Sequence, residues 1–278
     1  AILVVGGLVA ALYFILTRPA RVLPKWVAVG MVSDPDDFKG LLYSSSGKKW
    51  SESVTGTGFD AFGNGVAYSS EQNRWVTVGS NLITTPLPSS NIMYSSDGIC
   101  WQKTTQGSCF GSGGEGGGYG VAYGKDENDD DLWVAVGGND ISGGGSAYGN
   151  IQYSKYGGVS WEPTFEGGSF SSSGQAVAYG NNRWVAVGDN MTTGPGPGGA
   201  YGNILYSTNG GVCWIQTSEG DSFSISGEGV AYSSEQKLWV AVGYGLGDKY
   251  NNIMWSTNGT CWVATTEGDF FPSYGTAV

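Results

Sequence analysis

Histidine is absent from this sequence of 278 residues, and lysine and arginine together number only 13. Without histidine, the chain lacks the side chain that most often serves as a general base at neutral pH and as a zinc ligand. The 24 acidic residues give a net charge of −11. Because contacts to phosphates need clustered Lys and Arg, this charge argues against nucleic-acid binding. The composition therefore predicts neither a cofactor nor a nucleic-acid partner.

Cysteine is also scarce, and its four copies do not form the pattern of a disulfide framework. Cys100, Cys213 and Cys261 occupy one equivalent position of a repeat described below. Equivalent positions in different sheets lie beyond the roughly 7 Å Cα separation that a disulfide allows. Only Cys100 and Cys109 are close enough in sequence to be a candidate pair, and we interpret Cys213 and Cys261 as small buried hydrophobic side chains.

Two tryptophan phrases recur five times along the chain. The first is a WVAVG-like strand signal, and the second is a YSSDG-like or YSTNG-like turn that ends on another tryptophan. The tryptophans of the first phrase are Trp26, Trp75, Trp133, Trp184 and Trp239, and those of the second are Trp50, Trp101, Trp161, Trp214 and Trp262. A period of about fifty residues with short strands and abundant glycine is typical of a radial array of β-sheets.

Each repeat contains four short strand signals separated by turns. In the second repeat they lie at residues 65–68, 75–78, 92–94 and 100–102. Four strands per unit is typical of a β-propeller blade. The array begins in mid-repeat at Trp26, and residues 275–278 match the start of a first strand. We therefore predict an all-β, five-bladed propeller over residues 25–278, in which the C-terminal strand completes the first blade and closes the ring, removing both open edges.

Residues 1–17 contain no charged side chain and are followed by Arg18, Arg21 and Lys25. As a helix they would cover about 26 Å, the short end of a membrane span. A transmembrane helix, a signal-peptide core and a buried strand are the alternatives. We favour a retained single-pass anchor, followed by a linker at 18–24, and hence a membrane location. The cations after the span predict a cytoplasmic propeller, whereas glycosylation sequons at 190–192 and 258–260 suggest the other side.

The turn before the second tryptophan reads SSDGICW at 95–101 and STNGGVCW at 207–214. Serine and Asp or Asn oxygens accept hydrogen bonds from turn N–H groups, and glycine adopts positive φ. The phrase resembles the Asp-box of sialidase-type propellers, Ser-x-Asp-x-Gly-x-x-Trp, in all five repeats. In that family the box is structural, so the resemblance implies no site residue here. The blade number and closure resemble tachylectin-type lectins, and the WVAVG…YSTNG…W arrays resemble repeats of large algal DNA viruses, which implies a virion-associated structural protein.

Catalytic constellations are not evident. Sialidase-like enzymes use an arginine cluster, but Arg74 and Arg183 stand at the same repeat position on separate blades. Five-bladed glycosidases place carboxylates on their innermost strands, whereas the innermost strand signals here read Val-Ala-Tyr without an acid. We interpret the acidic run at 125–131 as a solvated hairpin tip rather than a calcium loop, and Asp34, Asp36 and Asp37 likewise. We predict no enzymatic activity and no metal site.

The long, uneven connections between second and third strands are the candidate binding surface. In a propeller they share one face with the connections between blades, and here they contain Tyr, Asn and Gly. The candidate ligand-binding residues are Tyr148, Asn150, Tyr201, Asn203, Tyr250 and Asn252. Aromatic faces and amides suit glycans or protein partners. The alternative is that each Asn caps the start of the third strand, and that the phenylalanines of the Glu-Gly-x-x-Phe connections pack between blades.

The functional expectation is a membrane-anchored, non-enzymatic propeller that acts as a structural or interaction subunit of a membrane-containing assembly such as a large virus particle. The alternatives are a glycan-binding lectin of a cell or virion surface and, third, a glycosidase.

Overall fold

The computed structural model describes residues 25–31, 40–53, 59, 61–80, 90–104, 110, 116–138, 149–164, 166–167, 170–189, 202–217, 223, 225–244, 252–266, 271 and 273–278. All regular elements in these ranges are β-strands, as the sequence predicts. The predicted anchor at 1–17 and the linker at 18–24 lie outside the described residues. Within the described part, no helix is long and apolar enough to cross a membrane.

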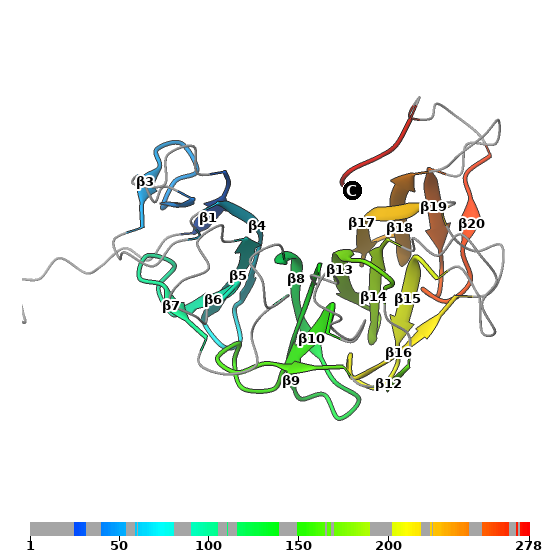
Figure 1. Ribbon diagram of the computed structural model, residues 1–278, viewed down its shortest axis with the longest axis horizontal. Helices are drawn as coiled ribbons and strands as arrows, with labels where there is room; N and C mark the ends of the chain where they lie inside the picture. The colour runs from blue at the N-terminus through cyan, green and yellow to red at the C-terminus, as the bar shows by residue number, and fades with distance from the viewer. Residues whose placement is uncertain are drawn as a thin grey trace, which may run out of the picture.

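The strands form successive antiparallel units that resemble propeller blades and follow one another round an arc (Figure 1). Unit 1 holds β1 (Trp26–Val29), β2 (Leu41–Ser44) and β3 (Ser51–Glu52). Unit 2 holds β4 (Phe62–Ser69), β5 (Arg74–Ser80), β6 (Ile92–Ser95) and β7 (Gln102–Lys103). Unit 3 holds β8 (Gly117–Lys125), β9 (Asp131–Gly138), β10 (Ile151–Ser154) and β11 (Glu162–Pro163). Unit 4 holds β13 (Gly174–Gly180), β14 (Arg183–Gly188), β15 (Ile204–Ser207) and β16 (Cys213–Gln216), with the short β12 (Glu166–Gly167) parallel to β16. Unit 5 holds β17 (Ser226–Ser233), β18 (Leu238–Tyr244), β19 (Ile253–Ser256) and β20 (Val263–Ala264).

The same contact joins each unit to the next. The end of each second strand forms a β-bridge with the start of the next first strand, as in Ser80 with Gly117 and Gly138 with Ser173. First strands lie beside one another, because β8 contacts β4 and β13, and β13 contacts β17. These strands carry the Val-Ala-Tyr phrase, so its predicted innermost position is confirmed.

The C-terminal residues continue this pattern without completing the first sheet. Tyr274 forms the same bridge with Tyr244, and the Gly275 amide donates to the Gly243 carbonyl at 3.2 Å. The tail therefore lies beside β17, where a next first strand would start (Figure 1).

The predicted hydrogen-bonded pairing between the tail and β1 is not present among the described residues, where β1 pairs with β2 alone. The tail and β1 are held by different neighbours. The tail is bonded to unit 5, whereas unit 1 is bonded to unit 2 through the Gly63 amide and the Gly30 carbonyl at 2.9 Å.

The hydrophobic core lies between consecutive sheets. One cluster combines Val134 and Val136 of unit 3 with Val177 and Trp184 of unit 4. The tryptophan of each second strand packs against the tyrosine of the paired first strand, and the ring centroids are 4.5–5.1 Å apart in units 2 to 5. Trp26, which has no preceding sheet beside it among the described residues, is 56% exposed. Trp133, Trp184 and Trp239, each beside a preceding unit, are fully buried, whereas Trp75, which packs against unit 1, is half-buried.

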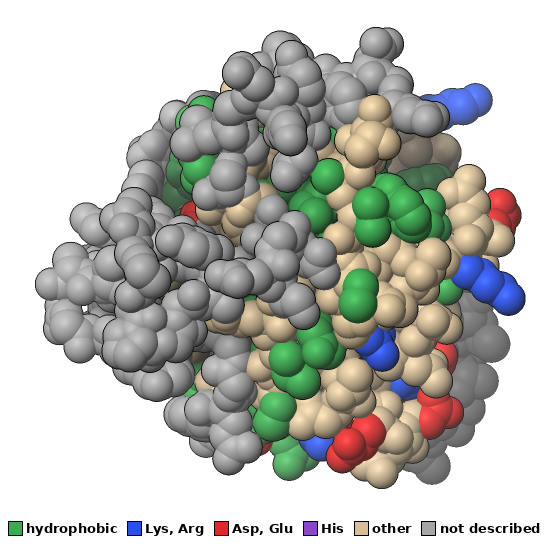
Figure 2. Space-filling view, turned by 90° about the vertical axis from the view of Figure 1, so that its right-hand side faces the viewer, with side chains coloured by type: hydrophobic (Ala, Val, Ile, Leu, Met, Phe, Trp, Pro, Cys, Tyr) green, Lys and Arg blue, Asp and Glu red, His purple; other side chains and the backbone are tan. Residues whose placement is uncertain are grey.

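The outer strands are less well covered. Ile215 in β16, Trp255 in β19 and Val263 in β20 are exposed, although each lies in a regular strand. Figure 2, which shows this side, has its apolar side chains in several groups between polar ones, and most of its charged side chains along the right-hand and lower parts of the view. Trp255 and Val263 are cross-strand partners, so their exposed side chains are neighbours on the outer part of unit 5.

The turn between third and fourth strands, here called the serine turn, forms the predicted local hydrogen bonds. In unit 2, Ser95 Oγ accepts from the Gly98 amide at 2.8 Å, and Asp97 Oδ1 accepts from the Cys100 amide at 2.7 Å. Gly98 has a φ of 66°, which glycine adopts without steric cost. In unit 4, the Trp214 indole donates to the Gly211 carbonyl at 2.8 Å. The turn is thus closed by its own side chains.

The glycine that ends the WVAVG phrase has a packing reason. A Cβ on Gly188 would lie 2.2 Å from the Ser173 carbonyl oxygen and 2.9 Å from the Phe170 ring. Gly79, Gly137 and Gly243 are crowded in the same way by the phenylalanine of the connection and by the carbonyl of the first residue of the following first strand. The absent side chain allows the connection between units to lie directly on the second strand.

We expect Gly188→Ala to lower the free energy of unfolding by about 3 kcal/mol, because the added methyl group overlaps a backbone oxygen as well as a ring. Gly30→Ala is the matched control, since Gly30 ends the same phrase in unit 1 and has no atom within 4 Å of its Cβ position. Its effect should lie within about 1 kcal/mol of zero. Urea unfolding of both variants measures the difference, and equal effects would contradict this account of the glycine.

Candidate functional site

The three predicted asparagines lie at the start of the third strands and are buried, with 1–3% of their surface exposed. Asn203 Nδ2 donates to the Phe223 carbonyl at 2.5 Å, and its Oδ1 accepts from the Phe223 amide at 2.8 Å. Asn150 forms the same pair of bonds with Phe170, and Asn252 donates to the Phe271 carbonyl. These amides therefore hold the connection to the next unit, whereas the alternative expected them to cap their own third strands, and ligand contact by them stays a prediction.

Sequence reasoning missed the equivalent residue of unit 2. Asn91 accepts from the Phe110 amide at 3.0 Å and donates to the Gly116 carbonyl at 3.1 Å. The signal was an Asn-Ile pair before each of these third strands. Tyr148, Tyr201 and Tyr250 lie outside the described residues, so their proposed ligand contacts stay predictions.

Each first strand of units 2 to 5 contains a β-bulge shortly after its start. The register shifts at a single residue in each strand, and these residues are Asn64, Tyr119, Gln175 and Glu228. The sequence signal is a Gly-x-Gly-Val or Gly-x-Ala-Val phrase in which x varies. Because bulges re-aim side chains, this position combines a fixed backbone with variable chemistry.

Glu228 corrects one prediction from the sequence. The innermost strands were expected to carry no acid, but β17 begins at Ser226 and includes Glu228. The carboxylate accepts from the Ser226 hydroxyl at 2.6 Å. A second carboxylate lies at the same end of the sheets, since Asp189 forms a bridge with Ser226 and accepts from Gln175 Nε2 at 3.1 Å. The prediction failed because the first strand was expected to begin at the Val-Ala-Tyr phrase, whereas β17 begins several residues earlier, at Ser226.

Arg74 and Arg183, the two arginines considered above as a possible cluster, lie on different sheets. Arg74 stands over the Tyr94 ring at 5.1 Å, and Arg183 stands over the Tyr206 ring at 5.6 Å. Each therefore packs on a tyrosine of its own unit, and the two do not converge on a common point.

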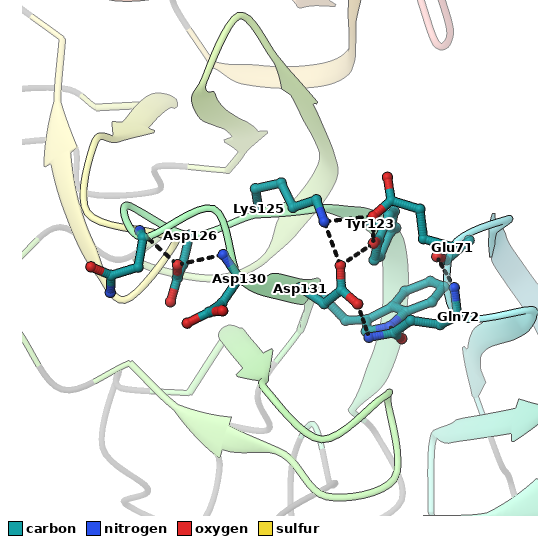
Figure 3. A network of polar contacts seen from close by, with 10 residues as sticks. Glu71, Gln72, Tyr123, Lys125, Asp126, Asp130 and Asp131 are labelled. Atoms are coloured by element: carbon teal, nitrogen blue, oxygen red, sulfur yellow. Dashed lines mark hydrogen bonds and ion pairs between the residues drawn. The ribbon is translucent and has the colours of Figure 1, made fainter.

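A polar network joins units 2 and 3 at the ends of β4 and β8 (Figure 3). The Lys125 ammonium lies 2.6 Å from both Glu71 and Asp131, which come from different units. The Tyr123 hydroxyl donates to Asp131, and Gln72 Nε2 donates to the other oxygen of the same carboxylate at 2.9 Å. Each partner of Asp131 thus fixes its carboxylate, and Glu71 ties it to the preceding unit through Lys125.

The network keeps its groups in defined protonation states. Burial, and then the hydrogen bond to Asp131, raise the pKa of Tyr123 to about 12. Burial raises the pKa of Asp131, but hydrogen bonds from Lys125, Tyr123 and Gln72 outweigh it, and the pKa lies below the usual value. Hydrogen bonds to Asp131 and Glu71 raise the pKa of Lys125. The ion pairs therefore persist across the neutral range, beside a neutral phenol.

The acidic run forms the tip of the β8–β9 hairpin, as predicted. Asp126 Oδ1 accepts from the amides of Asn128 and Asp130 at 2.8 and 3.1 Å, and residues 127–130 are exposed. The tip lies beside unit 4 and forms one wall of a cleft of about 430 Å³. The cleft is lined by Lys125, Asp126, Glu127 and Asp129 of unit 3 and by Tyr179, Asn182, Trp184, Thr208 and Gly210 of unit 4. The sequence alone could not reveal this cleft, because its two walls belong to different repeats.

No protein-family model matches this sequence, and no curated protein matches it. Solved structures similar to this chain include a GH74 enzyme of Niastella koreensis, with 18% identity, a TM-score of 0.48, and coverage of 87% of this chain and 30% of that chain. Ycf48 of Cyanidioschyzon merolae has 14% identity, a TM-score of 0.42, and coverage of 74% and 56%. The WD40 repeats of RRP9 have 12% identity, a TM-score of 0.49, and coverage of 88% and 63%. This chain spans less than two thirds of the length of each.

We expect Asn203→Ala to lower the free energy of unfolding by about 3 kcal/mol, because it removes two hydrogen bonds and leaves the buried backbone groups of Phe223 without partners. Asn252→Ala is the matched comparison and should cost about 1–2 kcal/mol, since Asn252 only donates and its Oδ1 has no partner. Thermal or urea unfolding measures which of the two variants loses more stability. A larger loss for Asn252→Ala would contradict the assigned contacts.

The raised pKa of Tyr123 predicts the alkaline behaviour of the unit 2–3 interface. The unfolded chain releases this proton near pH 10 and the folded chain near pH 12. The contribution of the protonated Tyr123 hydroxyl to the free energy of unfolding is therefore full below pH 10 and is lost as the pH rises toward 12. Up to about pH 11, the native protein and Tyr123→Phe should therefore gain equal phenolate absorbance at 295 nm. A deficit of one tyrosine in the variant over that range would show that Tyr123 ionises normally.

Proposed function

We propose that the protein is a membrane-anchored, five-bladed β-propeller that acts as a non-enzymatic structural or interaction subunit, in a membrane-containing assembly such as a large virus particle. Residues 1–17 provide the anchor, and the face of the long connections binds protein partners. The serine turns act as Asp-boxes in the structural role that this resemblance implies.

The observation that carries the proposal is the variable bulge position. Asn64, Tyr119, Gln175 and Glu228 occupy one place in the repeated backbone, although their side chains differ in charge, size and hydrogen-bonding capacity. They lie near the starts of first strands, which the β-bridges place beside the ends of second strands, where the long connections begin. A repeated scaffold with unlike side chains at one place suits recognition of an asymmetric protein surface.

Ring closure by the C-terminal tail belongs to the same proposal. The bridge between Tyr244 and Tyr274 supports it, because the same kind of bridge leads into the first strands of units 3 to 5. Closure would give β1 a second neighbour and cover Trp26. Amides of 25–30 should then exchange with deuterium as slowly as those of 184–188, and removal of 274–278 should accelerate the exchange of 25–30 as well as that of the end of β18, to which the tail is bonded. Unchanged exchange of 25–30 after the removal would contradict closure.

The full chain tests the main proposal. Flotation with liposomes should retain the intact chain and lose a chain lacking residues 1–17. Affinity purification of the anchored protein from its native membrane should recover a stoichiometric protein partner. Replacing the bulge residues, as in Asn64→Ala with Gln175→Ala, should weaken that recovery, whereas the exposed Tyr156→Ala on a serine turn should not. Recovery without any stoichiometric partner would contradict the proposal.

A lectin is the alternative that the tyrosines of the long connections favour. A glycan array probed with the chain would then show saturable retention. Tyr148→Ala or Tyr201→Ala should reduce retention about tenfold, the loss expected for about 1.4 kcal/mol of stacking, and Tyr156→Ala again serves as the control. Unchanged retention in both variants would remove these residues from the glycan site.

Glu228 favours a glycosidase as a third candidate, because an innermost strand does carry a carboxylate. Turnover of activated aryl glycosides that Glu228→Gln abolishes would establish this activity and overturn the non-enzymatic proposal.

A further inference from the structure

At the interface between units 2 and 3, a lysine ammonium lies over the ring of the tyrosine of a first strand. The Lys125 ammonium lies 6.0 Å from the centroid of the Tyr123 ring. Glu71, from the hairpin of the preceding unit, and Asp131 each bind the ammonium at 2.6 Å. An ammonium group near an aromatic face and paired with carboxylates is a favourable arrangement. Here the protein supplies the lysine itself.

The next interface has equivalent walls. Tyr179 corresponds to Tyr123, because it pairs with Trp184 as Tyr123 pairs with Trp133, and the ring centroids lie 4.9 and 5.1 Å apart. The preceding hairpin again supplies acids. In this second case, however, a cleft lies between the walls.

The turn of unit 4 explains why no lysine is present there. The β8–β9 hairpin continues after Tyr123 to the pair Lys125 and Asp131, whereas the β13–β14 hairpin turns at once through Asn181 and Asn182. Both asparagines have positive φ, at 49° and 54°. Tight two-residue turns of this kind favour Asn and Gly, so the short turn replaces the lysine and its partner by two amides.

The charges around the cleft leave two carboxylates without a cation. Asp126 is bound by the Lys155 ammonium at 3.3 Å. The Lys125 ammonium is engaged by Glu71 and Asp131 at the other interface. Among the described residues, no cation lies within ion-pair distance of Glu127 or Asp129, which line the cleft. Among the residues that line the cleft, three carboxylates therefore face one ammonium, that of Lys125, beside the ring of Tyr179.

We propose that this cleft binds a primary alkylammonium group, the side chain of a lysine on a partner protein. Tyr179 takes the place of Tyr123, and Glu127 and Asp129 take the place of the acids around Lys125. Asn182 and Thr208 offer further acceptors for the ammonium. A lysine is the occupant because its chain length and charge are those of the group that fills the preceding interface. The site is separate from the long connections and does not depend on the function proposed for them.

The test is a titration of the full chain, followed by the indole resonance of Trp184, which lines the cleft and donates to the Lys125 carbonyl at 2.9 Å. The probes are Nα-acetyl-lysine methylamide and its norleucine analogue, which has the same apolar stem without the ammonium. The lysine probe should bind saturably, and its affinity should fall about fivefold from low to high salt. The norleucine probe should not bind.

Exposed side chains provide variants that leave the fold intact. Glu127→Gln with Asp129→Asn should weaken the lysine probe about tenfold, because both acids of the cleft are lost. Asp130→Asn removes the same kind of charge from the same hairpin but does not line the cleft, so its affinity should stay within about twofold. Equal affinities of the two variants, equal binding of norleucine, or equally tight binding of ethanolamine as a lipid headgroup would each overturn the assignment to lysine.

Discussion

The fold depends on close contact between consecutive sheets. Each sheet has little apolar surface that it can bury within itself, so its tryptophan and valines must be covered by a neighbour. The contact is made where a phenylalanine of the connection lies on the glycine that ends a second strand, with an asparagine bound to the backbone of the same phenylalanine. Glycine allows the approach, the ring fills the space, and the buried amide satisfies the polar groups of the connection. Where this set is complete, as at Phe170 with Gly188 and Asn150, both sheets are well buried.

The exposure of residues at the two ends of the array follows from the same need for a covering sheet. Unit 1 is covered on one side only, and its Trp26 is largely exposed, although it stands in the same phrase as the buried Trp184. At the other end Phe271 is 40% exposed, whereas the equivalent Phe223 is 1% exposed. Sequence identity within the repeat therefore does not guarantee the same environment. Burial follows the extent of the neighbouring sheet, since Trp75, beside the three-stranded unit 1, is half-buried.

The interfaces also differ in electrostatics. Between units 2 and 3, Lys125 binds acids from both sides beside the neutral phenol of Tyr123, so both carboxylates have a cationic partner. Between units 3 and 4 the hairpin acids line a cleft with Asn182 of the turn and Tyr179, and Glu127 and Asp129 have no ion-pair partner among the described residues. One backbone arrangement thus yields a closed ionic contact in one place and an open acidic cleft in the next, through a difference of a few residues in hairpin length.

The sequence by itself determined the repeat, the strand type of the described elements other than β12 and the hydrogen-bonded serine turns, because these depend on residues near one another in the chain. It also placed the acidic run on a hairpin. It could not determine that Asn150, Asn203 and Asn252 hold the next connection, since their partners lie about twenty residues away, nor that Glu228 falls inside a first strand at a bulge. Only the tertiary structure decided the pairing of the C-terminal tail, the exposure of Trp26 and the cleft beside Tyr179. Each of these is a relation between different repeats, and a local pattern carries no information about which neighbour lies across an interface.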